Sequence, residues 1–149
     1  MNIKYIGKVN NPVNELVDDN WGQVQSEIEI NHEYADGLKG ITDFSHAIII
    51  FYMDKAQFNT ETDLVRRPRG RQDLAEYGIF AQRAKHRPNP IGITTVKIIS
   101  LDKNILTVRG LDAVNNTPVL DIKPYFKVFD NIEKSKQPKW VDDIMQDYF

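Results

Sequence analysis

Apolar and polar residues alternate along much of this chain with a period of two, a pattern typical of strands with one buried face. The clearest example is VQSEIEI (24–30), where every second residue from Val24 to Ile30 would face a core. IKYIGKV (3–9) predicts another strand, and the apolar run HAIIIFYM (46–53) predicts a buried one. The first third of the chain therefore favours a sheet.

Further strands are predicted after residue 90. ITTVKIIS (93–100) and NILTVRGL (104–111) flank the short segment 101–103 and predict a hairpin. TPVLDIKPYF (117–126) follows Asn115-Asn116, a residue type that tolerates the left-handed backbone of a turn. The sheet is thus expected to continue close to the end of the chain.

Helical periodicity is confined to short segments. HEYADGL (32–38) predicts a helical turn, and KWVDDIMQDY (139–148) predicts a short amphipathic helix, a candidate contact with a second subunit. About seven strands with one or two short helices predict a mainly β fold, either a β-barrel or a strongly curved sheet, which would also remove exposed sheet edges. We expect a single-domain β-barrel over residues 1–149.

Composition limits the chemistry and the cellular compartment expected for this protein. The chain has 149 residues, of which 41% are hydrophobic, and it contains no cysteine, so disulfides and thiolate nucleophiles are excluded. Its longest apolar run is strand-sized, well below the roughly 20 residues of a membrane span. The N-terminus lacks the pattern of a signal peptide. We expect a cytoplasmic protein without a membrane partner.

Charge is unevenly distributed along the chain. Residues 66–87 hold seven Lys or Arg against two acidic residues, a local net charge of +5 that leaves −7 for the rest. A basic segment on an acidic body predicts an anionic partner; the alternative is a solvated loop with scattered counter-ions. The long polar stretch 54–75 overlaps this segment and is interpreted as a functional loop.

Several familiar chemistries find no support in the sequence. No phosphate-binding P-loop and no G-x-G-x-x-G dinucleotide motif is present, which disfavours a Rossmann fold. The three histidines lack metal-ligand spacing, and no serine elbow motif exists. We therefore expect neither a bound metal nor a covalent nucleophile.

The stretch HRPNPIGITT (86–95) has an unusually stiff backbone. Pro88 and Pro90 fix their own φ angles and hold the residues before them in extended conformations. Gly92 then permits a conformation or a close approach that a side chain would forbid. A rigid ledge bearing arginines suits a reaction that depends on positioning, which can supply roughly 7–11 kcal/mol of a barrier.

Two long blocks carry a family resemblance. GIFAQRAKHRPNPIGIT (78–94) and LDAVNNTPVLDIKPY (111–125) resemble the TsaA-like (TrmO-type) family, and IGKVNNP (6–12), GITDFSHAIIIF (40–51) and RRPRGR (66–71) fit the same pattern. The resemblance implies methylation of threonylcarbamoyladenosine beside the tRNA anticodon, with S-adenosylmethionine (SAM) as donor. It also implies a non-Rossmann SAM-binding β-barrel that forms a homodimer, with the SAM site near the subunit interface.

The resemblance further implies roles for individual residues. The residues implied to hold SAM are Asn20, Trp21, Asp54, Lys55, Arg83, Ile93, Val114, Asn115, Asn116 and Thr117. Trp21 could stack on a base or plug the core, and Arg83 could bind SAM, bind a substrate carboxylate or form a surface salt bridge. The arginines expected to neutralise tRNA phosphates are Arg66, Arg67, Arg69, Arg71 and Arg87.

Two residues are candidates for the catalytic step. Asn89 could orient the adenine edge or close a turn on its own backbone. Asp121 could accept from the SAM ammonium group or take the proton of the adenine nitrogen; alternatively it pairs with Lys123 or with an arginine across the barrel. Both alternatives remain open at this point for each residue.

The chain also departs from the family pattern. Many bacterial members have Pro-Arg-Gln where this chain has Asn20-Trp21-Gly22, His-Gln in place of Asp54-Lys55, and Asp-Gly in place of Asn115-Asn116. Many continue into a C-terminal extension domain, which this chain is expected to lack. The alternatives are a methyltransferase of this fold acting on another substrate, a SAM-binding module without catalysis, and a barrel that binds nothing.

Overall fold

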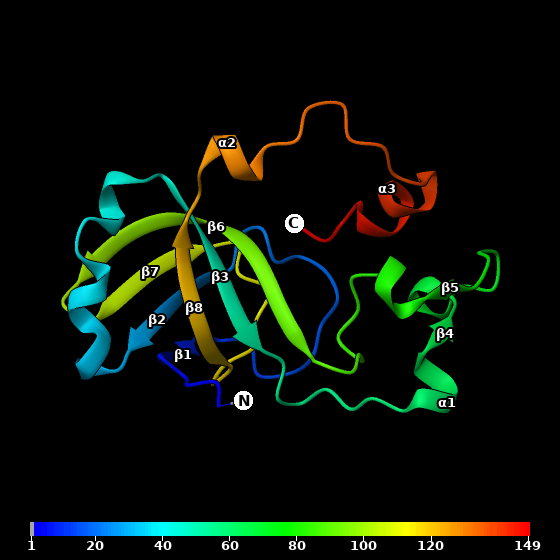
Figure 1. Ribbon diagram of the computed structural model, residues 1–149, viewed down its shortest axis with the longest axis horizontal. Coiled ribbons are helices and arrows are strands. Elements are labelled where there is room, and N and C mark those ends of the chain that lie inside the picture. The colour runs from blue at the N-terminus through cyan, green and yellow to red at the C-terminus, as the bar shows by residue number, and fades with distance from the viewer. Residues whose placement is uncertain (1) are drawn as a thin grey trace.

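The computed structural model describes residues 2–149 and places six antiparallel strands in a closed barrel (Figure 1). The strands of the barrel, in chain order, are β1 (Gly7–Asn10), β2 (Gln25–Ile30), β3 (His46–Tyr52), β6 (Ile91–Asp102), β7 (Ile105–Arg109) and β8 (Pro118–Pro124). Their order around the barrel is β1-β2-β7-β6-β3-β8. The predicted mainly β barrel is confirmed, although two further strands stand outside it.

The remaining elements are short. Two strands, β4 (Val65–Arg66) and β5 (Tyr77–Gly78), form a separate antiparallel ribbon. The helical elements are η1 (His32–Leu38), η2 (Ile41–Asp43), α1 (Thr60–Asp63), η3 (Pro68–Gly70), η4 (Ile79–Ala81), α2 (Lys127–Asp130) and α3 (Lys139–Met145). Within residues 2–149, none of the helices has the length and apolar character needed to cross a membrane.

The predicted alternation is confirmed in the central strands. Ser26, Ile28 and Ile30 of β2 are buried while their neighbours face outward, and β6 follows the same rule. Two predicted boundaries were wrong. The first strand begins at Gly7 rather than at residue 3, because pairing with β2 and β8 starts at Gly7. The hairpin turn is shorter than 101–103, because residues 101 and 102 continue β6 to Asp102.

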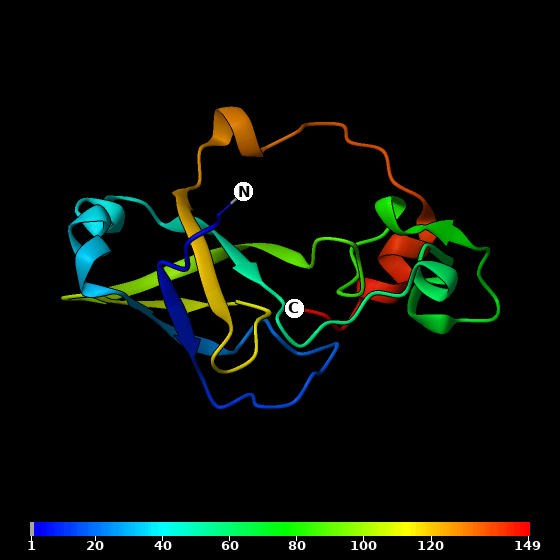
Figure 2. The same ribbon diagram turned by 60° about the horizontal axis from the view of Figure 1, so that its bottom comes forward.

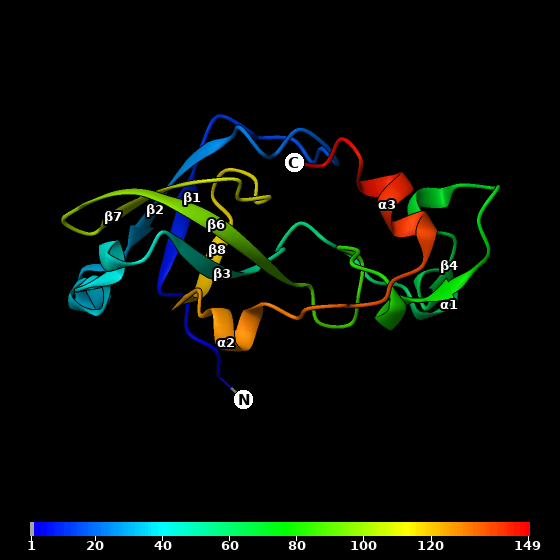
Figure 3. The ribbon, with the colours of Figure 1, turned by 90° about the horizontal axis from the view of Figure 1, so that it is seen from above.

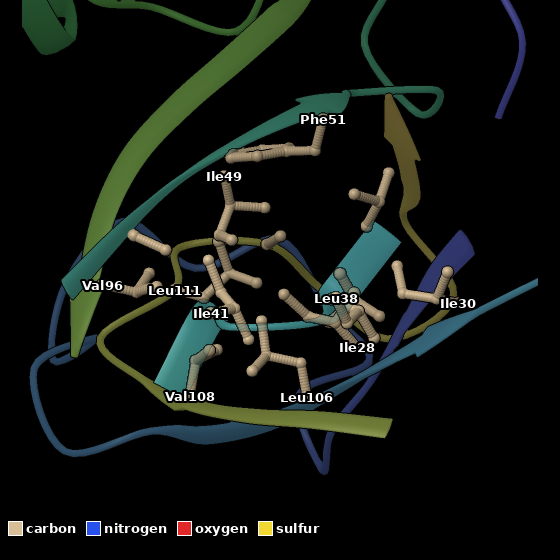
Figure 4. Packing of buried hydrophobic residues seen from close by; sticks show 14 residues of the cluster. Ile28, Ile30, Leu38, Ile41, Ile49, Phe51, Val96, Leu106, Val108 and Leu111 are labelled. Atoms are coloured by element: carbon tan, nitrogen blue, oxygen red, sulfur yellow. The ribbon is translucent and has the colours of Figure 1, made fainter. Parts of the chain in front are cut away.

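The interior of the barrel is filled by side chains from all six strands and from the segments that close its ends. Figure 4 shows aliphatic side chains of opposite walls, such as Ile28 and Ile49, meeting in the centre. Leu38 of η1 and Ile41 of η2 belong to the same cluster. The barrel is therefore a packed core rather than a channel, and any ligand must bind at its surface.

One end of the barrel, which we call the mouth, collects most of the functional candidates. β1, β3 and β7 end at the mouth, while β2, β6 and β8 begin there, since every strand pair is antiparallel. The opposite end is covered by η1 and η2, which lie between the end of β2 and the start of β3. The loops at the mouth therefore come from segments far apart in the sequence.

A lobe formed by residues 54–88, which we call the arm, extends away from the mouth (Figures 1 and 2). It holds α1, β4, η3, β5 and η4, so most of the predicted polar loop 54–75 belongs to a folded unit. The buried Gln82 holds this unit together, because its side-chain amide donates to the carbonyls of Arg66 and Tyr77 at 2.9 and 2.8 Å.

The C-terminal part of the chain connects the arm to the mouth. α3 packs on the arm, where the rings of Tyr77 and Trp140 lie 5.0 Å apart. The following residues, 146–149, which we call the tail, run back to the loop before β2 (Figure 3). The predicted helix thus ends at Met145. Trp140 contacts this chain's own arm, and contact of the helix face Trp140–Tyr148 with a second subunit stays a prediction.

Candidate functional site

The mouth brings together residues that the sequence separates by almost one hundred positions. Asn20 and Trp21 precede β2, Asp54 and Lys55 follow β3, and Arg83 precedes β6, of which Ile93 is the third residue. The turn Val114–Thr117 leads directly into β8. All of the residues implied to hold SAM therefore lie at one end of the barrel.

One side of the mouth is a network of amide side chains. The turn at Asn115-Asn116 is confirmed, and Asn116 adopts a left-handed φ of 66°. The Asn115 side-chain oxygen accepts from the amide of Asn11 at 3.2 Å, and its side-chain nitrogen donates to the Asn14 side chain at 3.1 Å. Lys55 Nζ donates to the Asn14 carbonyl at 3.4 Å, which links the end of β3 to this network.

The loop before β2 forms the other side of the mouth and pairs with the tail. The amides of Asn20 and Trp21 donate to the carbonyls of Asp147 and Tyr148, both at 2.8 Å. The Trp21 side chain is 3% exposed, so its indole packs in the interior, which favours the core plug over base stacking. The backbone of this loop, rather than the Trp21 ring, is thus what the mouth presents.

The floor of the mouth holds a carboxylate that the sequence did not single out. Asp112 accepts hydrogen bonds from the hydroxyls of Thr94 and Tyr148, one on each carboxylate oxygen. Burial raises the pKa of the Tyr148 phenol well above its ordinary value, and the negative charge of Asp112 adds to this effect. Asp112 lies in the LDAVNNTP block that carries the resemblance, which was the available signal.

The raised pKa of Tyr148 makes a prediction about alkaline titration. The folded chain binds the phenol proton more tightly than the unfolded chain, so this contribution to stability is complete below about pH 10 and is lost as the pH rises above it. In ultraviolet titration we expect Tyr148 to ionise at a higher pH than free tyrosine. Tyr148→Phe should remove this late step, and an unchanged titration curve for the variant would contradict the assignment.

The proline-braced ledge, residues 82–90, joins η4 of the arm to β6. Arg83 Nη2 donates to the Ile93 carbonyl at 2.7 Å, so Arg83 forms a backbone contact instead of the surface salt bridge considered above. The carbonyl of the exposed Asn89 accepts from the Ile91 amide at 2.8 Å and closes a short turn around Pro90. Residues 82–90 contain no helix and no strand, as expected for a ledge that positions arginines.

Asp121 lies within β8 rather than in one of the loops of the mouth. It pairs with Ile50 in the middle of β8 and forms an ion pair with Lys123 at 2.7 Å, the alternative considered for it above. The hydrogen bond from Lys123 to Asp121 raises the pKa of the Lys123 amine. Through Ile50, which also pairs with Ile93 of β6, Asp121 lies two strands away from Ile93, and its catalytic role stays a prediction.

The arginines of the basic segment are engaged within the chain. Arg66, Arg69 and Arg71 form ion pairs with Asp63, Asp19 and Asp73 at 3.2, 2.8 and 2.5 Å, respectively. Arg67 and Arg87 donate to the backbone carbonyls of Leu74 and Gln82. These ion pairs agree with the alternative of a segment with counter-ions, while contact of the five arginines with phosphates stays a prediction.

A shallow groove lies on the surface of the arm. It has a volume of about 390 Å³, within the range of small-molecule sites. Its lining combines an aromatic ring with charged and amide groups, from Gln57, Phe58, Asn59, Asp63, Arg66 and His86. The groove thus places one of the arginines beside a surface that could accommodate a planar group.

Comparison with known proteins places this geometry in a family. Residues 6–131 match the model of the tRNA-methyltransferase O N-terminal domain. A protein of Archaeoglobus fulgidus named S-adenosyl-L-methionine-binding protein is 38% identical over 138 residues, 90% of this chain and 96% of that protein. A human tRNA (adenine(37)-N6)-methyltransferase is 34% identical over 116 residues, 78% of this chain and 25% of the human protein.

The fold has a close counterpart among solved structures. The crystal structure of TrmO from Pseudomonas aeruginosa matches with a TM-score of 0.76 at 24% identity, over 94% of this chain and 61% of that one. Another relative, a probable S-adenosyl-L-methionine-binding protein of Archaeoglobus fulgidus, is 44% identical over 74% of this chain. The matched region covers only 29% of the length of that relative. The chain belongs to the family of the tRNA-methyltransferase O N-terminal domain.

Proposed function

We propose that this chain is a SAM-dependent methyltransferase that methylates the exocyclic amino nitrogen of threonylcarbamoyladenosine beside the tRNA anticodon. The observation that carries the proposal is the convergence of the implied SAM residues on one barrel mouth. Relatives named as SAM-binding proteins and as tRNA (adenine(37)-N6)-methyltransferases support the cofactor and the reaction. The basic residues of the arm support an RNA partner.

The mouth has the chemistry that such a cofactor requires. Asp112 offers a negative charge for a cationic group, and Ile93, 49% exposed, offers an apolar surface beside Arg83. Bound SAM would supply an electrophilic methyl group on a sulfonium. Transfer of this methyl group to the adenine nitrogen would release S-adenosylhomocysteine, and the proton of that nitrogen would pass to solvent. The ledge serves to hold the nitrogen in line, since positioning dominates such transfers.

The proposal is tested by incubating the purified chain with methyl-labelled SAM and tRNA that carries threonylcarbamoyladenosine. We expect label in the tRNA and a nucleoside heavier by one methyl group in mass spectrometry. Transcripts without the modification provide the matched control and should remain unlabelled. Label in both RNAs, or in neither, would contradict the proposed substrate.

A methyltransferase acting on another substrate is the second candidate. It is favoured by the altered residues of the mouth, Asn20-Trp21, Asp54-Lys55 and Asn115-Asn116, and by the ion pairs that occupy the arm's arginines. A SAM-binding module without catalysis is a third reading, consistent with the names of the archaeal relatives. Labelled SAM added to a cell extract separates them, because only an enzyme transfers the methyl group to a product.

We also propose that the chain works in the cytoplasm as a homodimer with the SAM site near the subunit interface. Support for the dimer comes from large apolar side chains on and beside α2, where Val128, Phe129 and Ile132 are 82%, 75% and 74% exposed. Surfaces of this kind commonly mark protein contacts. Because α2 follows the end of β8 that lies opposite the mouth, the placement of the SAM site near the interface rests on the family resemblance instead. Light scattering coupled to size-exclusion chromatography should give twice the monomer mass of 17.2 kDa, and a monomer at micromolar concentration would contradict the dimer.

A further inference from the structure

The tail is attached to both sides of the mouth at once. Its backbone accepts from the amides of Asn20 and Trp21 on one side. Its Tyr148 hydroxyl donates to Asp112, on the loop that leads to the turn Val114–Thr117, on the other side. An added Cβ at Gly22 would lie 2.5 Å from the Phe149 carbonyl carbon, which shows how closely the tail packs on the loop.

The Asp112 carboxylate is held by two hydroxyls that come from different parts of the chain. Thr94 is buried in β6 and fixes one oxygen, while the half-buried Tyr148 fixes the other. A carboxylate with both oxygens engaged has a defined orientation, whereas one with a single partner can rotate. Without the Tyr148 hydroxyl, only Thr94 would orient Asp112, and the loop after it would lose its link to the tail.

The arm also contacts the tail. The Arg69 guanidinium lies 5.9 Å from the centre of the Tyr148 ring, and it donates to the Asp18 carbonyl and the Asp19 carboxylate at 3.0 and 2.8 Å. Phe149 packs edge-on against the Tyr148 ring, with the ring centres 4.8 Å apart. The ring of Tyr148 is thus placed by packing, which leaves its hydroxyl free to act on Asp112.

We propose that Tyr148 is a positioning residue of the mouth, which orients Asp112 and joins the loop before β2 to the loop before β8 for binding of the cofactor. This inference rests on the proposed function, because it assigns Tyr148 to the same SAM site. Tyr148 does not take part in methyl transfer. It holds the two loops in place before the ligand binds, which lowers the conformational entropy lost on binding.

The test measures binding of S-adenosylhomocysteine, the demethylated product, by calorimetry. Tyr148→Phe keeps the ring and removes only the hydroxyl, and we expect it to weaken binding about threefold to tenfold. Tyr34→Phe is the matched control, because Tyr34 lies in η1 at the opposite end of the barrel. We expect this control to bind as tightly as the unmodified chain.

A double-mutant cycle separates positioning through Asp112 from a general loss of structure. If Tyr148 acts through Asp112, then Asp112→Asn with Tyr148→Phe should bind about as weakly as Asp112→Asn alone. In the Tyr148→Phe variant without ligand, hydrogen exchange at the Asn20 and Trp21 amides should also be faster than in the unmodified chain. This measurement reports on the attachment of the tail independently of ligand binding.

Each other outcome overturns the inference. Independent, multiplicative losses in the cycle would show that Tyr148 does not act through Asp112. Tighter binding by Tyr148→Phe would show that the tail occupies the place of the ligand, and unchanged binding would remove its role. If the unmodified chain itself fails to bind S-adenosylhomocysteine, the proposed function fails. If the unmodified chain binds and only the expected effect of Tyr148→Phe is missing, the role of Tyr148 fails while the proposed function stands.

Discussion

Replacing Gly92 with alanine is expected to lower the free energy of unfolding by roughly 3 kcal/mol, the upper part of the usual range for overpacking a core. Gly92 stands directly opposite Phe51 across the β3–β6 pair. An added Cβ would lie 2.3 Å from two ring carbons of Phe51, which is itself buried in the core. Because Phe51 is packed within the core cluster, either its ring or the barrel wall must shift, and either shift disturbs core packing. Denaturant unfolding followed by circular dichroism measures the loss.

Two further variants sharpen this experiment. Gly37→Ala is the matched control, because a Cβ at Gly37 meets nothing within 4 Å and should leave stability unchanged or slightly higher. Adding Phe51→Leu to Gly92→Ala should recover part of the loss, since the smaller side chain vacates the space of the ring. A stable Gly92→Ala variant would contradict the close approach described here.

Local patterns predicted those parts of the fold that depend on local causes. Alternation predicted β2 and β6 because one face of each strand is buried in the barrel and the other is not. The need for glycine at position 92 was also predicted, and the contact with Phe51 supplies its physical reason. Resemblance to a family added the grouping of residues at the mouth, which no periodicity contains.

Asp121 shows why position in a strand does not determine where a side chain points. Val119 and Ile122 both pair with inward-facing residues of β3, Phe51 and Ile49, although three positions separate them in sequence. The register shift between Ile50 and Phe51 supplies the extra residue, as in a β-bulge. Strict alternation from Val119 would turn Asp121 inward; the bulge turns it outward to Lys123.

The contacts that sequence reasoning missed join distant segments. Tyr148 and Asp112 are 36 positions apart, and Arg69 and Asp19 are 50 apart. Such pairs depend on the path of the whole chain, so a count of charges in 66–87 could not reveal that the arginines meet acidic partners. The tail likewise left its predicted helix after Met145, because pairing with the loop before β2 supplies its backbone hydrogen bonds.

Replacing Arg83 with alanine is expected to weaken binding of S-adenosylhomocysteine by about 10- to 100-fold, the value of a hydrogen bond to a charged group. Arg83 is exposed at the mouth, and its contact with the Ile93 carbonyl already directs the guanidinium along the start of β6. Lysine at this position should restore little, because an ammonium lacks the planar fork that grips a carboxylate or a backbone carbonyl together with a ligand.

Stability and binding separate cleanly in this prediction. Because Arg83 is exposed and forms a single hydrogen bond here, Arg83→Ala should unfold at nearly the same denaturant concentration as the unmodified chain. Lys39→Ala provides the control for loss of one positive charge, since Lys39 is exposed beside η1 at the opposite end of the barrel. If both variants weaken binding equally, net charge explains the effect and the specific role of Arg83 is wrong; a loss confined to Arg83→Ala places the ligand at the ledge.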